Sequence, residues 1–115
     1  MQNFQQIHDA AHAAGMAALD ASTPTPMVVS DNRSGQKWFV ADGVCGFAWV
    51  KFAGNTAWAR WAKSMKLASK AYPNGLMIWV GYGNQSMTKK EAYAAAYAQV
   101  LRDNGITAYS QSRMD

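Results

Sequence analysis

The stretch Val44-Cys45-Gly46-Phe47-Ala48-Trp49-Val50-Lys51-Phe52 decides the fold, because it is apolar at alternate positions on both faces and carries one charge. A strand of this kind lies inside a sheet. One face holds Val44, Gly46, Ala48, Val50 and Phe52, and its small residues would let a helix approach closely. The other holds Cys45, Phe47, Trp49 and Lys51, and is either covered by another layer or serves as a stacking surface for bases. The aromatic signature of an RNA-recognition strand is absent.

The segments on both sides of this strand carry helix and strand patterns. Apolar residues recur at helical spacing over 3–21, from Asn55 or Thr56 to about Lys70, and from a Thr88–Glu91 capping box to Asn104, with a left-handed cap at Gly105. Strand patterns cover 27–29, 36–40, 76–82 and 106–111. A tight turn at 41–43 leads into the central strand, so the simplest arrangement for 27–52 is a three-stranded meander.

Together these patterns predict an α+β fold. We expect an antiparallel or mixed sheet of four to five strands with two helices packed on one face, plus an alanine-rich N-terminal helix. Residues 1–21 are predicted to form that helix, residues 22–26 a proline-containing linker, and residues 27–115 a single domain. The N-terminal helix is expected to dock on the body, cover the other sheet face, or pair with its counterpart in a homo-oligomer.

Positive charge is concentrated in the middle of the chain, where no Asp or Glu occurs between Gly43 and Lys90. All five tryptophans lie in or beside this block. Basic side chains interleaved with aromatic ones are typical of surfaces that bind nucleic acid or an acidic protein. The alternative is that the lysines keep an apolar domain soluble and the tryptophans fill its core.

Seven cations are the candidate binding residues. Four of them are expected to project from one outward sector of the second helix, and two sit at the start of the third helix, where an anion would also meet free backbone amides. The full set is Arg60, Lys63, Lys66, Lys70, Lys89, Lys90 and Arg113, with Trp49, Asn84 and Gln85 as candidate stacking or contact residues.

No catalytic constellation is visible in the sequence. His8 and His12 are four residues apart on one helix, but the intervening acid is Asp and a third metal ligand is missing, so we expect no metal and no cofactor. Cys45 cannot form an internal disulfide and is interpreted as a small buried side chain. The chain shows neither a signal peptide nor a membrane span, which predicts a soluble, cytoplasmic protein that does not act as an enzyme.

The segments DGVCGFAWV (42–50), NQSMTKKEA (84–92) and GITAYSQSRMD (105–115) resemble a family of small uncharacterised proteins encoded by tailed bacteriophages. The resemblance leaves the N-terminal helix outside it. It implies an accessory role in the cytoplasm of the infected host cell and transfers no catalytic residues.

Three functions are compatible with these observations. The first is a non-enzymatic module that binds nucleic acid through the basic helix face and adjacent lysines. The second is a host-protein-binding inhibitor, an anti-defence or host-takeover factor that uses the basic face or the N-terminal helix. The third is a virion or assembly component.

Overall fold

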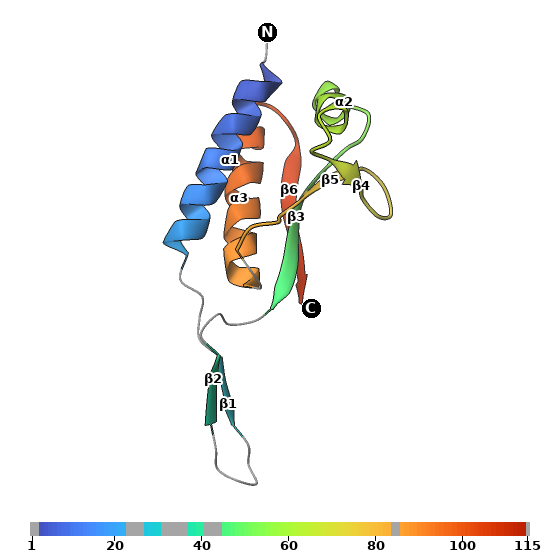
Figure 1. The fold of residues 1–115 in the computed structure, drawn as a ribbon. Helices are drawn as coiled ribbons and strands as arrows, with labels where there is room; N and C mark the ends of the chain where they lie inside the picture. Colours follow the sequence, from blue (N-terminus) through green and yellow to red (C-terminus); the bar gives the residue numbers. More distant parts are fainter. Residues whose placement is uncertain (1–2, 23–26, 31–36, 41–44, 84–85, 115) are drawn as a thin grey trace.

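A computed structural model describes residues 3–22, 27–30, 37–40, 45–83 and 86–114 (Figure 1). Three helices and six strands follow in the order α1 (Phe4–Ala21), β1 (Met27–Ser30), β2 (Lys37–Val40), β3 (Gly46–Phe52), α2 (Ala57–Ser64), β4 (Ser69–Lys70), β5 (Leu76–Trp79), α3 (Met87–Asp103) and β6 (Ala108–Met114). The predicted α+β fold with an N-terminal helix is confirmed, and the main sheet has four strands.

The main sheet has the strand order β4-β5-β3-β6, and every neighbouring pair is antiparallel. From β3 onward the elements follow as β-α-β-β-α-β with β3 and β5 in the middle, which is the split β-α-β arrangement. The stretch that opened the sequence analysis is therefore a central strand.

The predicted three-stranded meander is wrong. β1 and β2 pair with each other in a separate two-stranded sheet, which extends from one end of the body in Figure 1. A strand has two hydrogen-bonding edges, and β5 and β6 occupy those of β3. The linker was predicted at 22–26; Ser22 is the C-cap of α1, and residues 23–26 lie outside the described residues, as does the predicted turn at 41–43.

One face of β3 forms the core with α3. Ala48, Val50 and Phe52 are buried, as predicted for this face. Gly46 is needed for close packing, because an added Cβ would lie 2.6 Å from the Arg113 carbonyl oxygen and 2.6 Å from the Met87 sulfur. The prediction that small residues allow a helix to approach this face is confirmed at Gly46.

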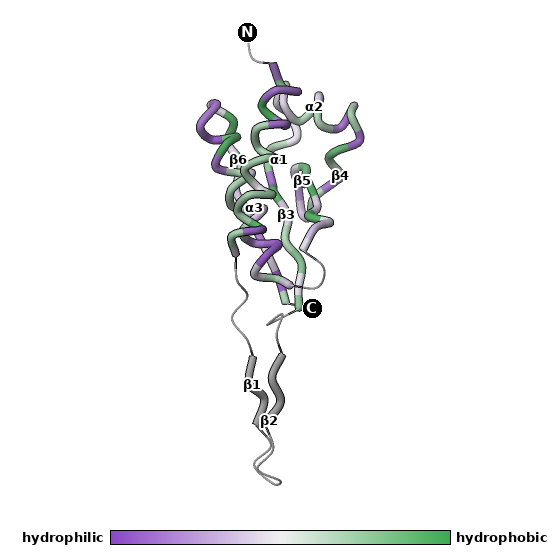
Figure 2. Tube along the Cα trace, turned by 60° about the vertical axis from the view of Figure 1, so that its left-hand side comes forward, coloured by the Kyte–Doolittle hydropathy of each residue, from purple (hydrophilic) through white to green (hydrophobic). Residues whose placement is uncertain are grey.

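α1 docks on α3, and the two helices lie side by side (Figures 1 and 2), on one side of β3 in the view of Figure 1. Its buried residues Ile7, Ala11 and Leu19 belong to the same core as the sheet. Gly15 sits against the Tyr93 ring, where an added Cβ would lie 2.7 Å from two ring carbons. α1 therefore covers a helix rather than the second face of the sheet.

The substitution Gly15→Ala tests this docking, because the docking decides whether the substitution raises or lowers the free energy of unfolding. In an undocked helix, alanine would raise stability by about 1 kcal/mol relative to glycine. Against the Tyr93 ring it overpacks the contact, and we expect the free energy of unfolding to fall by about 1–2 kcal/mol in urea denaturation. The exposed Ala17→Gly substitution on the same helix controls for helix propensity. A more stable Gly15→Ala variant would show that α1 does not pack on Tyr93.

α2 is shorter than its apolar pattern predicts. Thr56 is the N-cap and accepts a hydrogen bond from the Ala59 amide at 3.1 Å. The helix ends at Ser64 because Lys66 adopts a left-handed conformation with φ of 60°. The outward sector predicted for four cations is wrong in consequence, since Lys66 follows the helix and Lys70 lies in β4. Met65, the C-cap of α2, is 49% exposed.

The start of α3 also differs from the capping box predicted at Thr88. Ser86 is the N-cap, and its hydroxyl accepts from the Lys89 amide at 3.3 Å. An isolated bridge to Cys45 holds Ser86 in place, and that pairing is a tertiary contact with no local sequence signal. The C-terminal end agrees with the prediction, with Asn104 as the C-cap and Gly105 at φ of 80°.

Candidate nucleic-acid interface

The second face of the sheet is open. Phe47, Trp49 and Lys51 point away from the core and are partly exposed. α1 and α3 lie together on the opposite side of β3 and β6 (Figure 1), and the buried residues of α2 belong to the same core as theirs. Cys45, predicted to be buried, is exposed because it precedes β3 at a position without a covering layer.

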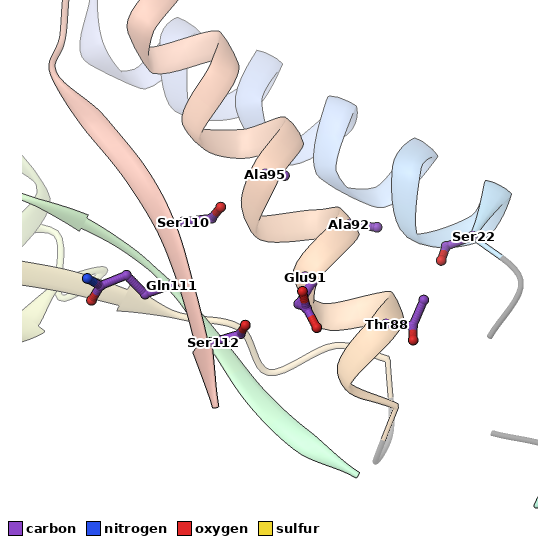
Figure 3. A pocket seen from close by; sticks show the side chains of 8 residues that line it. All are labelled: Ser22, Thr88, Glu91, Ala92, Ala95, Ser110, Gln111 and Ser112. Atoms are coloured by element: carbon purple, nitrogen blue, oxygen red, sulfur yellow. The ribbon is translucent and has the colours of Figure 1, made fainter. Parts of the chain in front are cut away.

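Strand register brings residues of three strands together on this face, because directly paired residues share a side of the sheet. Trp49 of β3 pairs with Trp79 of β5 and with Gln111 of β6. Gln111 points to the opposite side of β6 from Ser110 and Ser112, as Figure 3 shows. The open face therefore consists of Phe47, Trp49, Lys51, Met77, Trp79, Tyr109, Gln111 and Arg113.

Its centre is a pair of tryptophans. The rings of Trp49 and Trp79 are parallel, with centroids 5.7 Å apart, and the Phe47 ring lies 5.3 Å from that of Trp79. The Trp49 indole Nε1 donates a hydrogen bond to Gln111 Oε1 at 2.9 Å, which fixes its orientation. Trp79 is 43% exposed, an unusual solvent contact for so large an apolar side chain.

Cations border these rings. A pocket of about 250 Å³ is lined by Trp49, Lys70, Tyr72, Met77, Trp79 and Arg113. The Arg113 guanidinium carbon lies 5.6 Å from the centroid of the Phe47 ring, within cation–π range. None of the residues of the open face is acidic. Among the described residues, the site thus combines flat aromatic surfaces with positive charge and has no carboxylate that would repel an anion.

The structure separates the seven predicted cations. Lys70 and Arg113 meet at the tryptophan pocket, whereas Arg60 and Lys63 are exposed on α2 and do not line it. Lys66 lines a different pocket.

The remaining predicted contacts lie at or near the start of α3. Lys89 is partly exposed in the first turn of the helix. Lys90 is 7% exposed, and its ammonium donates to the Gly46 carbonyl at 3.1 Å, so its charge is used inside the fold. Asn84 and Gln85 lie outside the described residues.

Several residues of the interface were not singled out from the sequence. Trp79, Tyr109 and Tyr72 were assigned to strands or turns without a binding role. Trp79 occurs in a strand that is apolar on both sides, so alternation alone does not tell which face it occupies. The register with Trp49 assigns it to the open face.

A second cluster joins α1 to α3 through two hydrogen bonds of 2.6 Å, between His8 Nδ1 and the Tyr97 hydroxyl and between His12 Nδ1 and the Tyr93 hydroxyl. Burial raises the pKa of both tyrosines far above its ordinary value, and each is raised further by a neighbouring tyrosine, so both phenols stay protonated. Burial also lowers the pKa of His8; Asp9 opposes this and His12 adds to it.

Two further observations concern ligands in general. Among the described residues, no group of three potential His, Cys, Asp or Glu ligands is placed to hold a metal ion. A groove of about 590 Å³ runs between α3 and β6 (Figure 3), lined mainly by hydroxyl-bearing and small side chains. Among its described lining residues, Glu91 is the one charged side chain, and there is neither an aromatic ring nor a cation.

None of the helices in the described part of the chain is long and apolar enough to cross a membrane. Comparison of the chain with protein-family models, with curated proteins and with solved structures found no match.

Proposed function

We propose that the open face binds single-stranded nucleic acid. Bases stack on Trp49 and Trp79, and Lys70, Arg113 and Lys51 contact the phosphates. The observation that carries this proposal is the parallel tryptophan pair on an uncovered sheet face, in which Trp79 is exposed and Trp49 is partly exposed. Every base has a π-face, so such a pair favours unpaired bases with little sequence preference.

The surroundings of the pair support the same ligand. A nucleic-acid strand presents its charge beside its bases, and Lys70 and Arg113 line the pocket that the two rings form. RNA-recognition domains use the same physical device, in which aromatic side chains on a four-stranded sheet stack two or three bases. Here Phe47, Trp49 and Trp79 lie on β3 and β5, the two middle strands.

Single strands are expected to bind better than duplexes. In a duplex the bases are already stacked and paired, so the tryptophans would have to displace those contacts. The cations alone would retain a weaker, salt-sensitive attraction to duplex phosphates.

Fluorescence anisotropy with labelled single-stranded and duplex oligonucleotides of equal length tests the proposal. We expect the single strand to bind more tightly and its affinity to fall between about 50 and 200 mM salt, with a log–log slope of about −2 for three phosphate contacts. Absence of binding to any oligonucleotide at the lower salt concentration would overturn the proposal, as would a preference for the duplex.

The alternative partner is an acidic host protein, in keeping with the phage accessory role that the resemblance implies. A pull-down from host lysate with and without nuclease separates the two. We expect the captured material to disappear after nuclease treatment. Capture that survives nuclease and is lost when Trp79 is replaced would instead favour a protein partner on the same face.

A further inference from the structure

The pocket between α1, the segment after α2 and the end of β5 contains a cluster of basic groups that the stacking surface does not use. It has a volume of about 280 Å³, and its chemically active lining residues are His8, His12, Lys66 and Tyr82. Trp79 lines this pocket and the tryptophan pocket alike. The two sites therefore share a wall, and a ligand that stacks on Trp79 lies at the border of the second pocket.

We propose that this pocket binds a backbone phosphodiester of the strand stacked on Trp49 and Trp79, and that protonation of the histidines strengthens the binding. The inference rests on the proposed function, because the phosphate belongs to the same bound strand.

The hydrogen bonds of the two histidines leave the required groups available. Nδ1 of each ring is engaged by a tyrosine hydroxyl, so Nε2 is the nitrogen left to meet a ligand. A tyrosine hydroxyl both donates and accepts, so the contact persists when the imidazole takes up a proton. The centroids of the His8 and His12 rings are 6.2 Å apart, and both rings line the same small pocket.

The groups around the histidines favour the binding of an anion. On α1 the neighbouring titratable group is Asp9, whose side chain accepts a hydrogen bond from Gln5. On α3 the facing groups are Tyr93 and Tyr97, both neutral, and Tyr82 lies against His12. Lys66 is the one permanent cation among the described residues that line the pocket. Bringing a phosphodiester into contact with His8 and His12 would favour their charged form.

The left-handed backbone conformation of Lys66 helps to form the pocket. Its φ of 60° ends α2 and begins the segment that forms one wall of the pocket. Asparagine tolerates this conformation better than most residues, so Lys66→Asn removes the charge with little backbone strain. Lys63→Asn is the matched control, because Lys63 is an exposed cation on α2 that does not line the pocket.

The test measures affinity for an oligothymidylate with hydroxyl groups at both ends at pH 7.5 and 5.5 and constant salt. Neither its bases nor its phosphodiesters titrate in this range, and the chain has only two histidines, both in the pocket. We expect affinity to rise about 5-fold or more on acidification. Lys66→Asn should weaken binding about 5-fold, and Lys63→Asn by less than about 2-fold.

Unfolding at low pH cannot account for a higher affinity at pH 5.5. Because the pKa of His8 is lowered in the folded state, the unfolded chain binds more protons, and stability is lost as the pH falls below about 6.5. Acidification therefore weakens binding by lowering the stability of the folded state. It strengthens binding by charging the histidines that contact the phosphate. A second measurement needs no variant: NMR titration of the His8 ring should move to higher pH when the oligonucleotide is added.

The outcomes separate the two proposals. If no oligonucleotide binds at either pH, the proposed function itself fails. If oligothymidylate binds with the same affinity at both pH values and Lys66→Asn behaves like Lys63→Asn, the stacking surface stands and the phosphate pocket is overturned. If inorganic phosphate shifts the His8 signal and the oligonucleotide leaves it unchanged, the pocket takes free phosphate and the inference is again wrong.

Discussion

Replacing Trp49 and Trp79 together by alanine is expected to weaken binding of single-stranded oligonucleotides by about 30-fold or more. Each base stacked on an aromatic side chain contributes about 1–3 kcal/mol, so the loss of two stacking positions costs at least about 2 kcal/mol. The measurement is fluorescence anisotropy with the same oligonucleotide and salt for each variant. Because the two rings contact each other, the single substitutions need not add up to the double one.

The matched control replaces both tryptophans with phenylalanine. Phenylalanine keeps a π-face at each position and gives up only the Trp49 hydrogen bond to Gln111, so most of the affinity should remain. Circular dichroism should show the alanine variant folded, since neither Trp49 nor Trp79 belongs to the buried core. Unchanged affinity in a folded alanine variant would remove the tryptophan pair as the binding surface.

Trp58→Ala is expected to have the largest effect on stability, lowering the free energy of unfolding by about 3–5 kcal/mol. Trp58 is 2% exposed and meets Phe4, Phe52 and Trp61 at centroid distances of 5.7, 5.9 and 5.3 Å. Its removal leaves a cavity where α1, α2 and β3 converge. Natural domains are stable by about 5–15 kcal/mol, so much of the margin would be lost. Urea denaturation gives the free energies.

Trp58→Phe is the informative companion substitution. The Trp58 indole nitrogen is buried without a hydrogen-bond partner among the described atoms, so phenylalanine removes no polar contact and fills most of the space. We expect it to cost less than half of the alanine effect. An alanine variant within about 1 kcal/mol of the parent protein would mean that the junction of α1, α2 and β3 is not packed as described.

The elements and the polarity of β3 follow largely from local sequence. Helix and strand patterns located all three helices and the strands β1, β2, β3, β5 and β6, because side-chain periodicity reflects which face an element buries. The same periodicity separated the core face of β3 from the face that bears Trp49. It missed the early end of α2, because the conformation of Lys66 interrupts a pattern that remains helical in composition.

Only some residues of the candidate site could be predicted from the sequence. Trp49 was named as a stacking residue and Lys70 and Arg113 as ligand-binding cations, yet nothing in the linear order brings these three together. Lys90 shows the opposite error, because its place beside Lys89 suggests a surface charge while the fold directs its ammonium to Gly46. Whether a lysine is a surface cation depends on burial, and burial is a tertiary property.

By itself, the sequence determined that this chain folds as an α+β domain around the strand that ends at Phe52, with one small-residue face suited to helix packing. Only the tertiary structure decided which strands flank it, that α1 docks on α3, and that the Trp49 face stays open. Periodicity depends on neighbours two to four residues apart, whereas strand pairing and layer order depend on contacts between distant segments. Those distant contacts place Trp79 beside Trp49 and the two histidines beside Lys66.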